Sequence, residues 1–439
     1  MIAPAAVDAS PVVVAERPTR IRYFTLAFAL SLAVITYIDR VGISQASGAI
    51  RRDLGLTTIE MGWVLGIFGW TYALFEIPGG WLADRIGPRR VLMRIVLWWS
   101  FFTAATGWAW SFSSLLVARA LFGAGEAGCY PSLTRVFTIW LPRNERERAQ
   151  AMLWLVSRWS GALTPLLVVW VLSFVSWRRA FELFGVLGAV WAIAFYWWYR
   201  DAPADHPAVN RAELALLPSG KETARVEGGI PWRLLAGTPS VWLLCVQYAC
   251  LAYGWWFYVT WLPTYLRDAR GTTVALGALL SGLPLLFGGF GCMVSGALTR
   301  PLAARLGSVV RARRVLAITG FAGASACIIL FTRIEDPVRA MFVLGFAGFF
   351  NDFVMPPAWA GCMDVGGRYA GTVSGAMNTF GSLAGAVSAT FVGYLLFWTN
   401  NDWTLTFYIS AGIYSIGGLC WLFLDAHTPL ERPLASTTA

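Results

Sequence analysis

Twelve long apolar stretches set the strongest limit on what this chain folds into. They lie near residues 21–47, 58–83, 90–110, 112–140, 148–174, 179–199, 239–266, 273–300, 314–332, 338–362, 369–398 and 402–425. A helix rises about 1.5 Å per residue, so about 20 apolar residues cross the ~30 Å hydrocarbon core of a bilayer. The strands of a membrane barrel would instead alternate apolar and polar residues. The pattern therefore predicts an all-α membrane protein with twelve transmembrane helices.

A polar segment divides these stretches into two groups of six, as in transporters built from two repeated halves. We expect a disordered tail at 1–20, a six-helix half at 21–200, a cytoplasmic linker at 201–238, a second six-helix half at 239–425 and a C-terminal tail at 426–439. The first of these segments lacks the apolar core and cleavage site of a signal peptide, which is why we assign it to a tail.

Charge is scarce and unevenly placed. Only 13% of the residues are charged, about half the share found in soluble domains. The net charge of +10 comes from short cationic clusters between the apolar stretches, not from one basic stripe, which argues against nucleic-acid binding. With both termini in the cytoplasm, 22 of the 34 Lys and Arg residues lie on the cytoplasmic side and 8 on the other, as the positive-inside rule favours. We expect a monomeric multi-pass protein of a bacterial cytoplasmic membrane, with the lipid bilayer around it.

Motifs for enzymatic or ATP-driven chemistry are missing from the sequence. It has no G-x4-G-K-[ST] phosphate loop, no dinucleotide-binding fingerprint, and no His-Glu-x-x-His or Ser-His-Asp arrangement. The two histidines, His206 and His427, lie in polar connections, and the seven cysteines lie in apolar stretches without a Cys-x-x-Cys pair. These features predict a protein that is not an enzyme and has neither a metal site nor a cofactor.

Charged side chains inside the apolar stretches of the first half point to function. They are Asp39, Arg40, Arg119, Glu126 and Arg158. Each costs at least ~2.5–3.5 kcal/mol to insert, so such residues persist mainly where they face a cavity or a partner. Arg40 suits a fork of two parallel hydrogen bonds to a substrate carboxylate, with a structural ion pair as the alternative. Arg158 either holds a second anionic group or neutralises Glu126.

Two carboxylates are candidates for proton coupling. Glu126 and Arg119 are seven residues apart, so they share a helix face about 10 Å apart along the axis. A carboxylate between a dry environment and an Arg can gain or lose a proton when an anion binds, so Glu126 is the first candidate; its alternative role is a static Arg partner. Asp39 points about 100° away from Arg40 and is the second candidate, or else a buried counter-ion.

Neutral groups and one further charge complete the candidate site. Gln247, Ser374 and Asn378 offer hydrogen bonds suited to substrate hydroxyls, and Tyr37 and Tyr72 can donate to substrate or serve as core packing. In the second half, Asp352 is the mid-span charge, with a site role or, as the alternative, pairing within the core or capping near Pro356 and Pro357. Arg40, Arg119 and Arg158 against Asp39 and Glu126 give a local charge of +1 when all are ionised, which would favour a dicarboxylate.

A motif joins the second and third stretches and reads Gly80-Trp81-Leu82-Ala83-Asp84-Arg85-Ile86-Gly87-Pro88-Arg89-Arg90. It resembles the signature loop of the major facilitator superfamily. Small residues there let helices approach closely, an acid can cap or pair at a helix end, and the Arg cluster stays in the cytoplasm. The resemblance implies gating or structural roles for Gly80, Asp84, Arg85 and Gly87. The corresponding connection at 296–300 lacks the acidic residue.

A finer resemblance covers nearly the whole chain. Its motifs are Tyr37-Ile38-Asp39-Arg40, Tyr72, Glu76-Ile77-Pro78-Gly79-Gly80-Trp81, Arg119 with Glu126, Trp261-Leu262-Pro263-x-Tyr265-Leu266, and Asn378. Together they resemble the anion:cation symporter family, which includes bacterial galactonate, glucarate and hexuronate carriers and animal sialin-type carriers. Arg158 departs from the galactonate carriers, where a polar amide is expected.

The resemblance implies the major facilitator fold and proton-coupled symport of small organic anions by alternating access. The expected substrates are sugar acids such as hexonates, hexuronates or hexarates. An organic anion or organophosphate exchanger is the alternative, and a multidrug efflux antiporter is a more distant one. The implied site contains Arg40, Tyr37, Tyr72, Arg158, Gln247, Ser374 and Asn378 for substrate, with Glu126, Asp39 and Arg119 for proton coupling.

Overall fold

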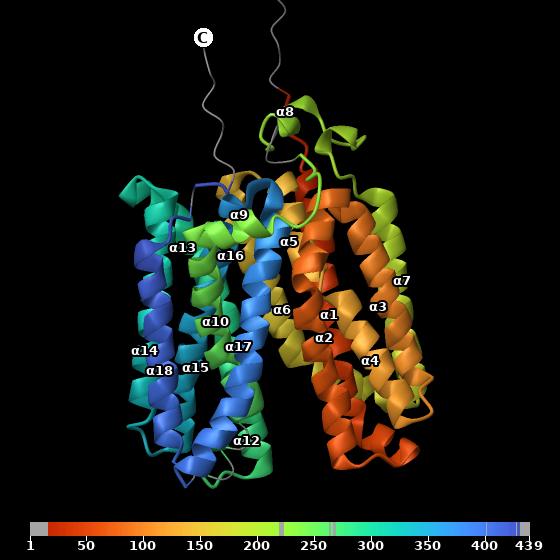
Figure 1. The fold of residues 1–439 in the computed structure, drawn as a ribbon, viewed down its shortest axis with the longest axis vertical. Helices are drawn as coiled ribbons and strands as arrows, with labels where there is room; N and C mark the ends of the chain where they lie inside the picture. Colours follow the sequence, from red (N-terminus) through yellow and green to blue (C-terminus); the bar gives the residue numbers. More distant parts are fainter. Residues whose placement is uncertain are drawn as a thin grey trace, which may run out of the picture.

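The computed structural model describes residues 16–218, 224–262, 265–266, 269–400, 402–426 and 428–430. Expectations for most of both tails, and for Pro263 of the seventh stretch, lie outside the described residues. The described part of the chain is helical apart from its connections, and the helices run side by side along one axis (Figure 1).

The first half consists of α1 (Ile21–Leu54), α2 (Thr58–Ile86), α3 (Pro88–Gly107), α4 (Phe112–Glu126), α5 (Cys129–Trp140), α6 (Arg143–Leu172) and α7 (Trp177–Trp198). The predicted fourth span is broken into α4 and α5. Gly128 stands at the break against the backbone of Gly79 in α2, and Pro131 follows within the first turn of α5. A proline cannot donate a helix hydrogen bond, so it favours a break or a new start there.

The linker contains η1 (Pro203–Asp205), α8 (Arg211–Leu214) and α9 (Trp232–Gly237). The second half consists of α10 (Pro239–Thr260), α12 (Val274–Ser281), α13 (Leu283–Leu306), α14 (Val309–Phe331), α15 (Pro337–Phe353), α16 (Met355–Gly366), η3 (Gly367–Tyr369), α17 (Ala370–Trp398) and α18 (Trp403–Phe423). Counting α4 with α5, α12 with α13, and α15 with α16 as single broken spans gives the expected six spans in each half. Seven described segments are long and apolar enough by themselves to cross a bilayer, and one of these, Pro337–Leu396, holds two spans.

One end of the bundle carries the linker helices α8 and α9 and the described C-terminal residues (Figure 1). We call this end the linker face. The halves pack against each other through α2 with α17, α6 with α13 and α16, and α5 with α17. At the linker face these contacts involve helix ends, because Gly80 near the end of α2 lies against the backbone of Gly371 at the start of α17.

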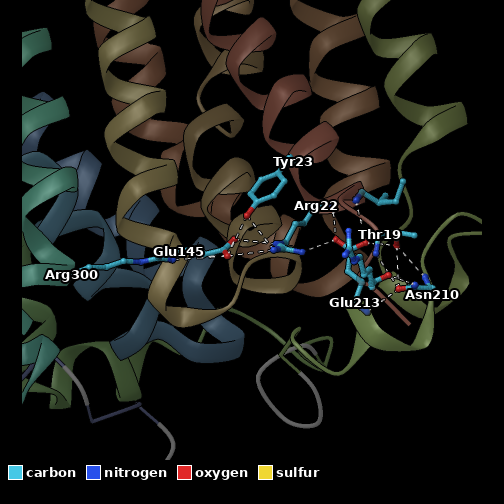
Figure 2. Close-up of polar contacts among 9 residues, drawn as sticks. Thr19, Arg22, Tyr23, Glu145, Asn210, Glu213 and Arg300 are labelled. Atoms are coloured by element: carbon cyan, nitrogen blue, oxygen red, sulfur yellow. Dashed lines mark hydrogen bonds and ion pairs between the residues drawn. The ribbon is translucent and has the colours of Figure 1, made fainter. Parts of the chain in front are cut away.

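The linker docks onto the start of α1 (Figure 2). The carboxylate of Glu213 in α8 is buried and accepts hydrogen bonds from the backbone N–H groups of Ile21 and Arg22 at 3.1 and 3.2 Å. It therefore caps α1, whose own N-cap residue supplies no side-chain bond. Thr19, within the segment expected as a tail, donates to the same carboxylate at 2.6 Å. Arg22 continues this chain of contacts to Glu145 at the start of α6.

Candidate functional site

An ion pair between Arg40 in α1 and Glu126 at the end of α4 lies at the centre of the first half. The Arg40 Nε lies 2.6 Å from Oε1 of Glu126. Glu126 is fully buried, whereas the Arg40 side chain is 23% exposed. The pair thus joins a fully buried acid to a partly exposed arginine side chain.

Aromatic rings surround the Arg40 guanidinium. Its centre lies 4.7 Å from the ring centroid of Tyr72, 5.3 Å from Phe68 and 5.7 Å from Tyr130. Rings on a cation's flanks hold it by cation–π attraction and leave the donors at its edge free to point along the ring planes. Within the described part of the chain, Nη2 of Arg40 and Oε2 of Glu126 have no hydrogen-bond partner. The pair therefore keeps one donor and one acceptor for a ligand or a proton.

Asp39 and Arg119 lie behind this pair and are buried. Asp39 is within electrostatic reach of both Glu126 and Arg119. Among the described residues, the Asp39 oxygens accept no hydrogen bond of good geometry, although the Trp99 side chain lies beside them, and Nε and Nη1 of Arg119 have no partner; the Arg119 guanidinium lies 4.2 Å from the Phe122 ring. Unsatisfied buried carboxylates are rare and call for an explanation. Protonation of Asp39 would lower the cost of its burial, since a neutral carboxyl loses less hydration free energy than a carboxylate.

Glu76 in α2 belongs to the same region, although the sequence analysis quoted it only within a motif. It is fully buried and accepts hydrogen bonds from Asn378 and, at 3.3 Å, from Ser382, both in α17. The contact joins the two halves. Its signal in the sequence was the same as for Glu126, a carboxylate in the middle of an apolar stretch. Asn378 thus lies at the site, bound to an acid of the other half.

Arg158 in α6 pairs with Asp352 in α15. Its Nε and Nη2 donate to the two oxygens of Asp352 at 2.7 and 3.0 Å. The expectation that Arg158 neutralises Glu126 is wrong, because Glu126 pairs with Arg40 instead. For Asp352 the structure shows the pairing role, although its partner lies in the other half and not in its own core. The two residues are 194 positions apart, so sequence spacing gave no sign of the contact.

The charge of the region differs from the expected value. Asp352 and Glu76 join Asp39 and Glu126 as acids, while the bases remain Arg40, Arg119 and Arg158. When all are ionised, the local sum is −1 and not the predicted +1. The electrostatic argument for a dicarboxylate therefore does not hold in its original form. Binding of an anion requires that acids be protonated or that an ion pair be opened.

The other three predicted substrate residues differ in their surroundings. Tyr37 is half-buried and packs against Gly161, one turn beyond Arg158. Gln247 is fully buried, donating to the Leu244 carbonyl at 3.1 Å and accepting from Trp421 at 3.3 Å. The amide of Gln247 is thus engaged within the second half.

Ser374 lies near the linker face, close to the start of α17. It is buried and donates to the carbonyl of Gly371 at 3.0 Å. The structure therefore places Ser374 one turn before Asn378, which together with Ser382 reaches Glu76 from α17.

The signature loop closes the linker face on the side of α17. The Asp84 carboxylate accepts hydrogen bonds from the backbone N–H groups of Gly371 and Thr372 at 2.9 and 2.6 Å, so it caps a helix of the other half. An acid at a helix N-terminus is favoured by the helix dipole as well as by these bonds. Arg135 lies 3.6 Å from Asp84 and also donates to the Gly367 carbonyl at 3.3 Å.

The remaining motif residues have structural surroundings. Gly80 allows the close approach of α2 to α17, and Gly87 adopts a φ of +91° beside the Asp201 carboxylate, where a side chain would be strained. That carboxylate accepts from the Arg89 N–H at 2.9 Å and so caps α3. Arg85 is exposed and lies 5.1 Å from the Trp81 ring.

The connection at 296–300, which lacks the acidic residue of the signature loop, is held by an acid from another helix, Glu147. Thr299, which stands before Arg300 as Asp84 stands before Arg85, donates at 2.6 Å to Glu147 at the start of α6. Glu147 also pairs with Arg313 of α14 at 3.0 Å. Arg313 and Arg146 of α6 share Asp364 of α16 at 2.7 and 2.9 Å. These four charged side chains are buried, and we call them the gate quartet: Arg146, Glu147, Arg313 and Asp364.

Comparison with known proteins agrees with this architecture. A model of the Major Facilitator Superfamily matches residues 29–389. The chain is 36% identical over 416 residues to a protein of Cupriavidus necator described as a probable sulfoacetate transporter, SauU, covering 94% of this chain and 96% of that protein. It is 32% identical over 395 residues to the D-galactonate transporter of Escherichia coli O6:H1, covering 87% of this chain and 90% of the relative.

Solved structures share the fold at low sequence identity. The proton:xylose symporter XylE superposes with a TM-score of 0.72 at 12% identity, covering 94% of this chain and 97% of that chain. The fucose:proton symporter FucP of Escherichia coli gives a TM-score of 0.71, also at 12% identity, over 92% of this chain. The fold, the family model and the full-length relatives agree. The chain is therefore a multi-pass membrane transporter, not an enzyme, and belongs to the major facilitator superfamily and, within it, to the anion:cation symporter family.

Proposed function

We propose that this protein is a proton-coupled symporter of small organic anions, with Arg40 as its anion-binding residue and Glu126 as its proton carrier. The observation that carries the proposal is the Arg40–Glu126 pair, in which a partly exposed arginine side chain is held by a fully buried carboxylate. An incoming carboxylate or sulfonate competes with Glu126 for the same donors. Planar guanidinium groups suit such bidentate contacts, which gives the competition its geometry.

Competition for Arg40 couples the anion to a proton. Once the ligand holds Arg40, the Glu126 carboxylate loses its counter-ion in a buried place and is stabilised by taking a proton. Release of the ligand restores the pair and expels the proton. Asp39 and Arg119 are the second stage of this relay, because the buried Asp39 lies within electrostatic reach of both Glu126 and Arg119.

The substrate class is inferred from the relatives and from the polar groups at the site. The relatives' names include sulfoacetate, D-galactonate and galactarate or D-glucarate, which share an acidic group on a short polar skeleton. Tyr72 flanks Arg40, and Tyr37 lies near both Arg40 and Arg158. Asn378 reaches the region from the other half through Glu76, so hydroxyl-bearing acids would find polar groups from both halves. Gln247 and Ser374 are assigned supporting roles, because their polar groups bond within the second half.

The contacts that join the two halves support transport by alternating access. Asp84, the gate quartet and Thr299 hold the halves together at the linker face, which we assign to the cytoplasm of a bacterium because it carries the linker and most cationic connections. This arrangement is closed toward the cytoplasm. Anion and proton would bind from the opposite side, and opening toward the cytoplasm would require these contacts to break.

The proposal is tested by uptake into proteoliposomes. Sulfoacetate, D-gluconate and D-glucarate, each labelled, are offered with and without an inward proton gradient. Symport predicts accumulation that depends on the gradient in the parent. In Glu126→Gln, which keeps the shape of a protonated carboxyl, ligand exchange should persist while gradient-driven accumulation is lost. Accumulation that needs no proton gradient but requires an anion on the far side would show an exchanger and refute the proposal.

A further inference from the structure

Arg158 and Asp352 form a second cation–acid pair that joins the two halves. The two hydrogen bonds are 2.7 and 3.0 Å long, and both side chains are buried. The Arg158 guanidinium centre lies 3.4 Å from the Trp255 ring centroid, so its flat face is stacked on the second half. Only the edge donors of the guanidinium are thus available for exchange between acids.

This pair is adjacent to the Arg40 site. The rings of Tyr130 and Trp154 stack at 5.0 Å with an angle of 7° between their planes. Arg40 lies 5.7 Å from the Tyr130 ring, and Arg158 lies 5.5 Å from the Trp154 ring. The first half therefore holds two cations on either side of one aromatic stack, each paired with an acid.

Asp352 remains anchored in the second half if Arg158 leaves it. The Asn351 amide donates to its Oδ1 at 2.9 Å, and the Asn351 carbonyl oxygen accepts from the Tyr414 hydroxyl at 2.7 Å. The Arg158 side, by contrast, has no other acid in hydrogen-bond contact among the described residues. Described titratable groups facing Asp352 are Arg158 of α6, Cys292 of α13, Tyr248 and Tyr258 of α10, and Tyr414 of α18. Apart from Arg158, none of these groups is cationic, so Asp352 has one counter-ion.

We propose that Arg158 and Asp352 select ligands with two acidic groups and bind a second proton with them. This inference deepens the proposed function and rests on it. The second acidic group of the ligand takes the edge donors of Arg158, and the freed Asp352 carboxylate forms an O–H bond with a proton from the water of the open side. One added negative charge enters with one added proton, so the charge of the region does not change.

The test is calorimetric binding to the full-length protein in nanodiscs. Two matched pairs of probes differ by one acidic group: D-glucarate with D-gluconate, and sulfoacetate with acetate. Titrations in two buffers of different ionisation enthalpy give the number of protons taken up. We expect the parent to take up one more proton with the dianion of each pair than with its monoanion, and to bind the dianion more tightly.

Substitutions at Arg158 and Asp352 test whether this ion pair causes the difference in affinity and proton uptake between dianion and monoanion. Arg158→Gln should weaken dianion binding roughly 10- to 150-fold, the value of a charged hydrogen bond, while changing monoanion binding less than about twofold. Asp352→Asn should abolish the additional proton. The double variant Arg158→Gln/Asp352→Asn leaves no buried charge unpaired, so it keeps the test valid if either single variant misfolds. It should bind both members of a pair with equal proton uptake.

The matched control is Trp159→Phe. Trp159 follows Arg158 in α6 and meets Phe290 of α13 at 5.4 Å, so it too joins the halves but carries no charge. It should leave the preference unchanged. Equal loss for dianion and monoanion in Arg158→Gln, or equal proton uptake with both probes in the parent, would overturn the inference while leaving the proposed symport intact. A parent protein that binds neither pair would refute the proposed substrate class and this inference together.

Discussion

The gate quartet predicts that Glu147 controls the balance between the two access states. Glu147 makes two bonds across the halves, to Arg313 at 3.0 Å and to Thr299 at 2.6 Å. Hydrogen bonds to charged groups contribute roughly 1.5–3 kcal/mol each. Glu147→Gln loses the charge but keeps the shape and an acceptor for Thr299. It should shift the equilibrium toward the state open at the linker face by at least ~1.5 kcal/mol, or about tenfold.

The charge balance of the quartet points the same way. Arg146 and Arg313 are matched by Glu147 and Asp364, so the buried quartet is neutral. Removing the Glu147 charge leaves one cation unmatched, and a buried unmatched cation is stabilised by water when the face opens. Glu147→Ala loses both cross-half bonds and should shift the balance by ~3 kcal/mol, roughly 150-fold. A graded series from parent to Gln to Ala is therefore expected.

Distances between spin labels measure this balance. Arg90 at the start of α3 and Arg311 at the start of α14 are exposed, belong to different halves and lie at the linker face, so cysteines there report its opening. Six of the seven native cysteines are buried, and the partly exposed Cys327 can be replaced by Ala. The population of molecules with a long distance between the labels should increase from the parent to Glu147→Gln and again to Glu147→Ala.

The control is Arg179→Gln, which removes an exposed ion pair with Glu182 inside α7. Exposed pairs contribute ~0–1 kcal/mol, and both residues belong to one half, so the distances should not change. Unchanged distances in Glu147→Ala, or a shift toward the closed face, would refute the reasoning.

Other predictions follow from single contacts. Arg40→Ala should abolish anion binding in a folded protein, and Arg40→Lys should also bind poorly because a point charge lacks the two-pronged geometry; calorimetric affinity within about twofold of the parent would contradict this. Asn378→Ala removes a cross-half bond to Glu76 and should lower transport more than folding, as uptake and thermal unfolding measured together would show. Glu213→Gln weakens the cap of α1 and its bond to Arg22, so the apparent Tm should fall by about 1 °C, corresponding to ~1 kcal/mol, with uptake retained; an unchanged Tm in replicate scans would show that the linker contact does not stabilise α1.

Much of the architecture was predictable from the sequence, because the free-energy cost of placing a segment in hydrocarbon depends on the residues of that segment. The stretches near 21–47 and 369–398 are apolar over their own length, whatever they touch, so their helical spans and their division into halves follow from the printed residues. The same cost marks Arg40, Glu126 and Arg158 as exceptions that need partners.

The sequence indicated some of the helix breaks. Pro356 and Pro357 open α16 after α15 ends at Phe353, and the prolines stand in the sequence. The break at Gly128 was not predicted, although Pro131 in the first turn of α5 stands in the sequence; the close approach of Gly128 to the backbone of Gly79 is known only from the structure. Helix periodicity gives the faces of a helix but not the neighbour that each face meets.

The partners of the buried charges were decided by the tertiary structure alone. Arg40 reaches Glu126 across 86 positions, and Arg158 reaches Asp352 across 194, while Glu76 finds its donors 302 and 306 positions away. A salt bridge depends on atoms meeting within about 4 Å. That separation is set by helix packing within the first half for Arg40 and Glu126, and by packing between the halves for Arg158 and Asp352. The sequence shows which buried charges need a partner, and only the packing of the helices decides which residue that partner is.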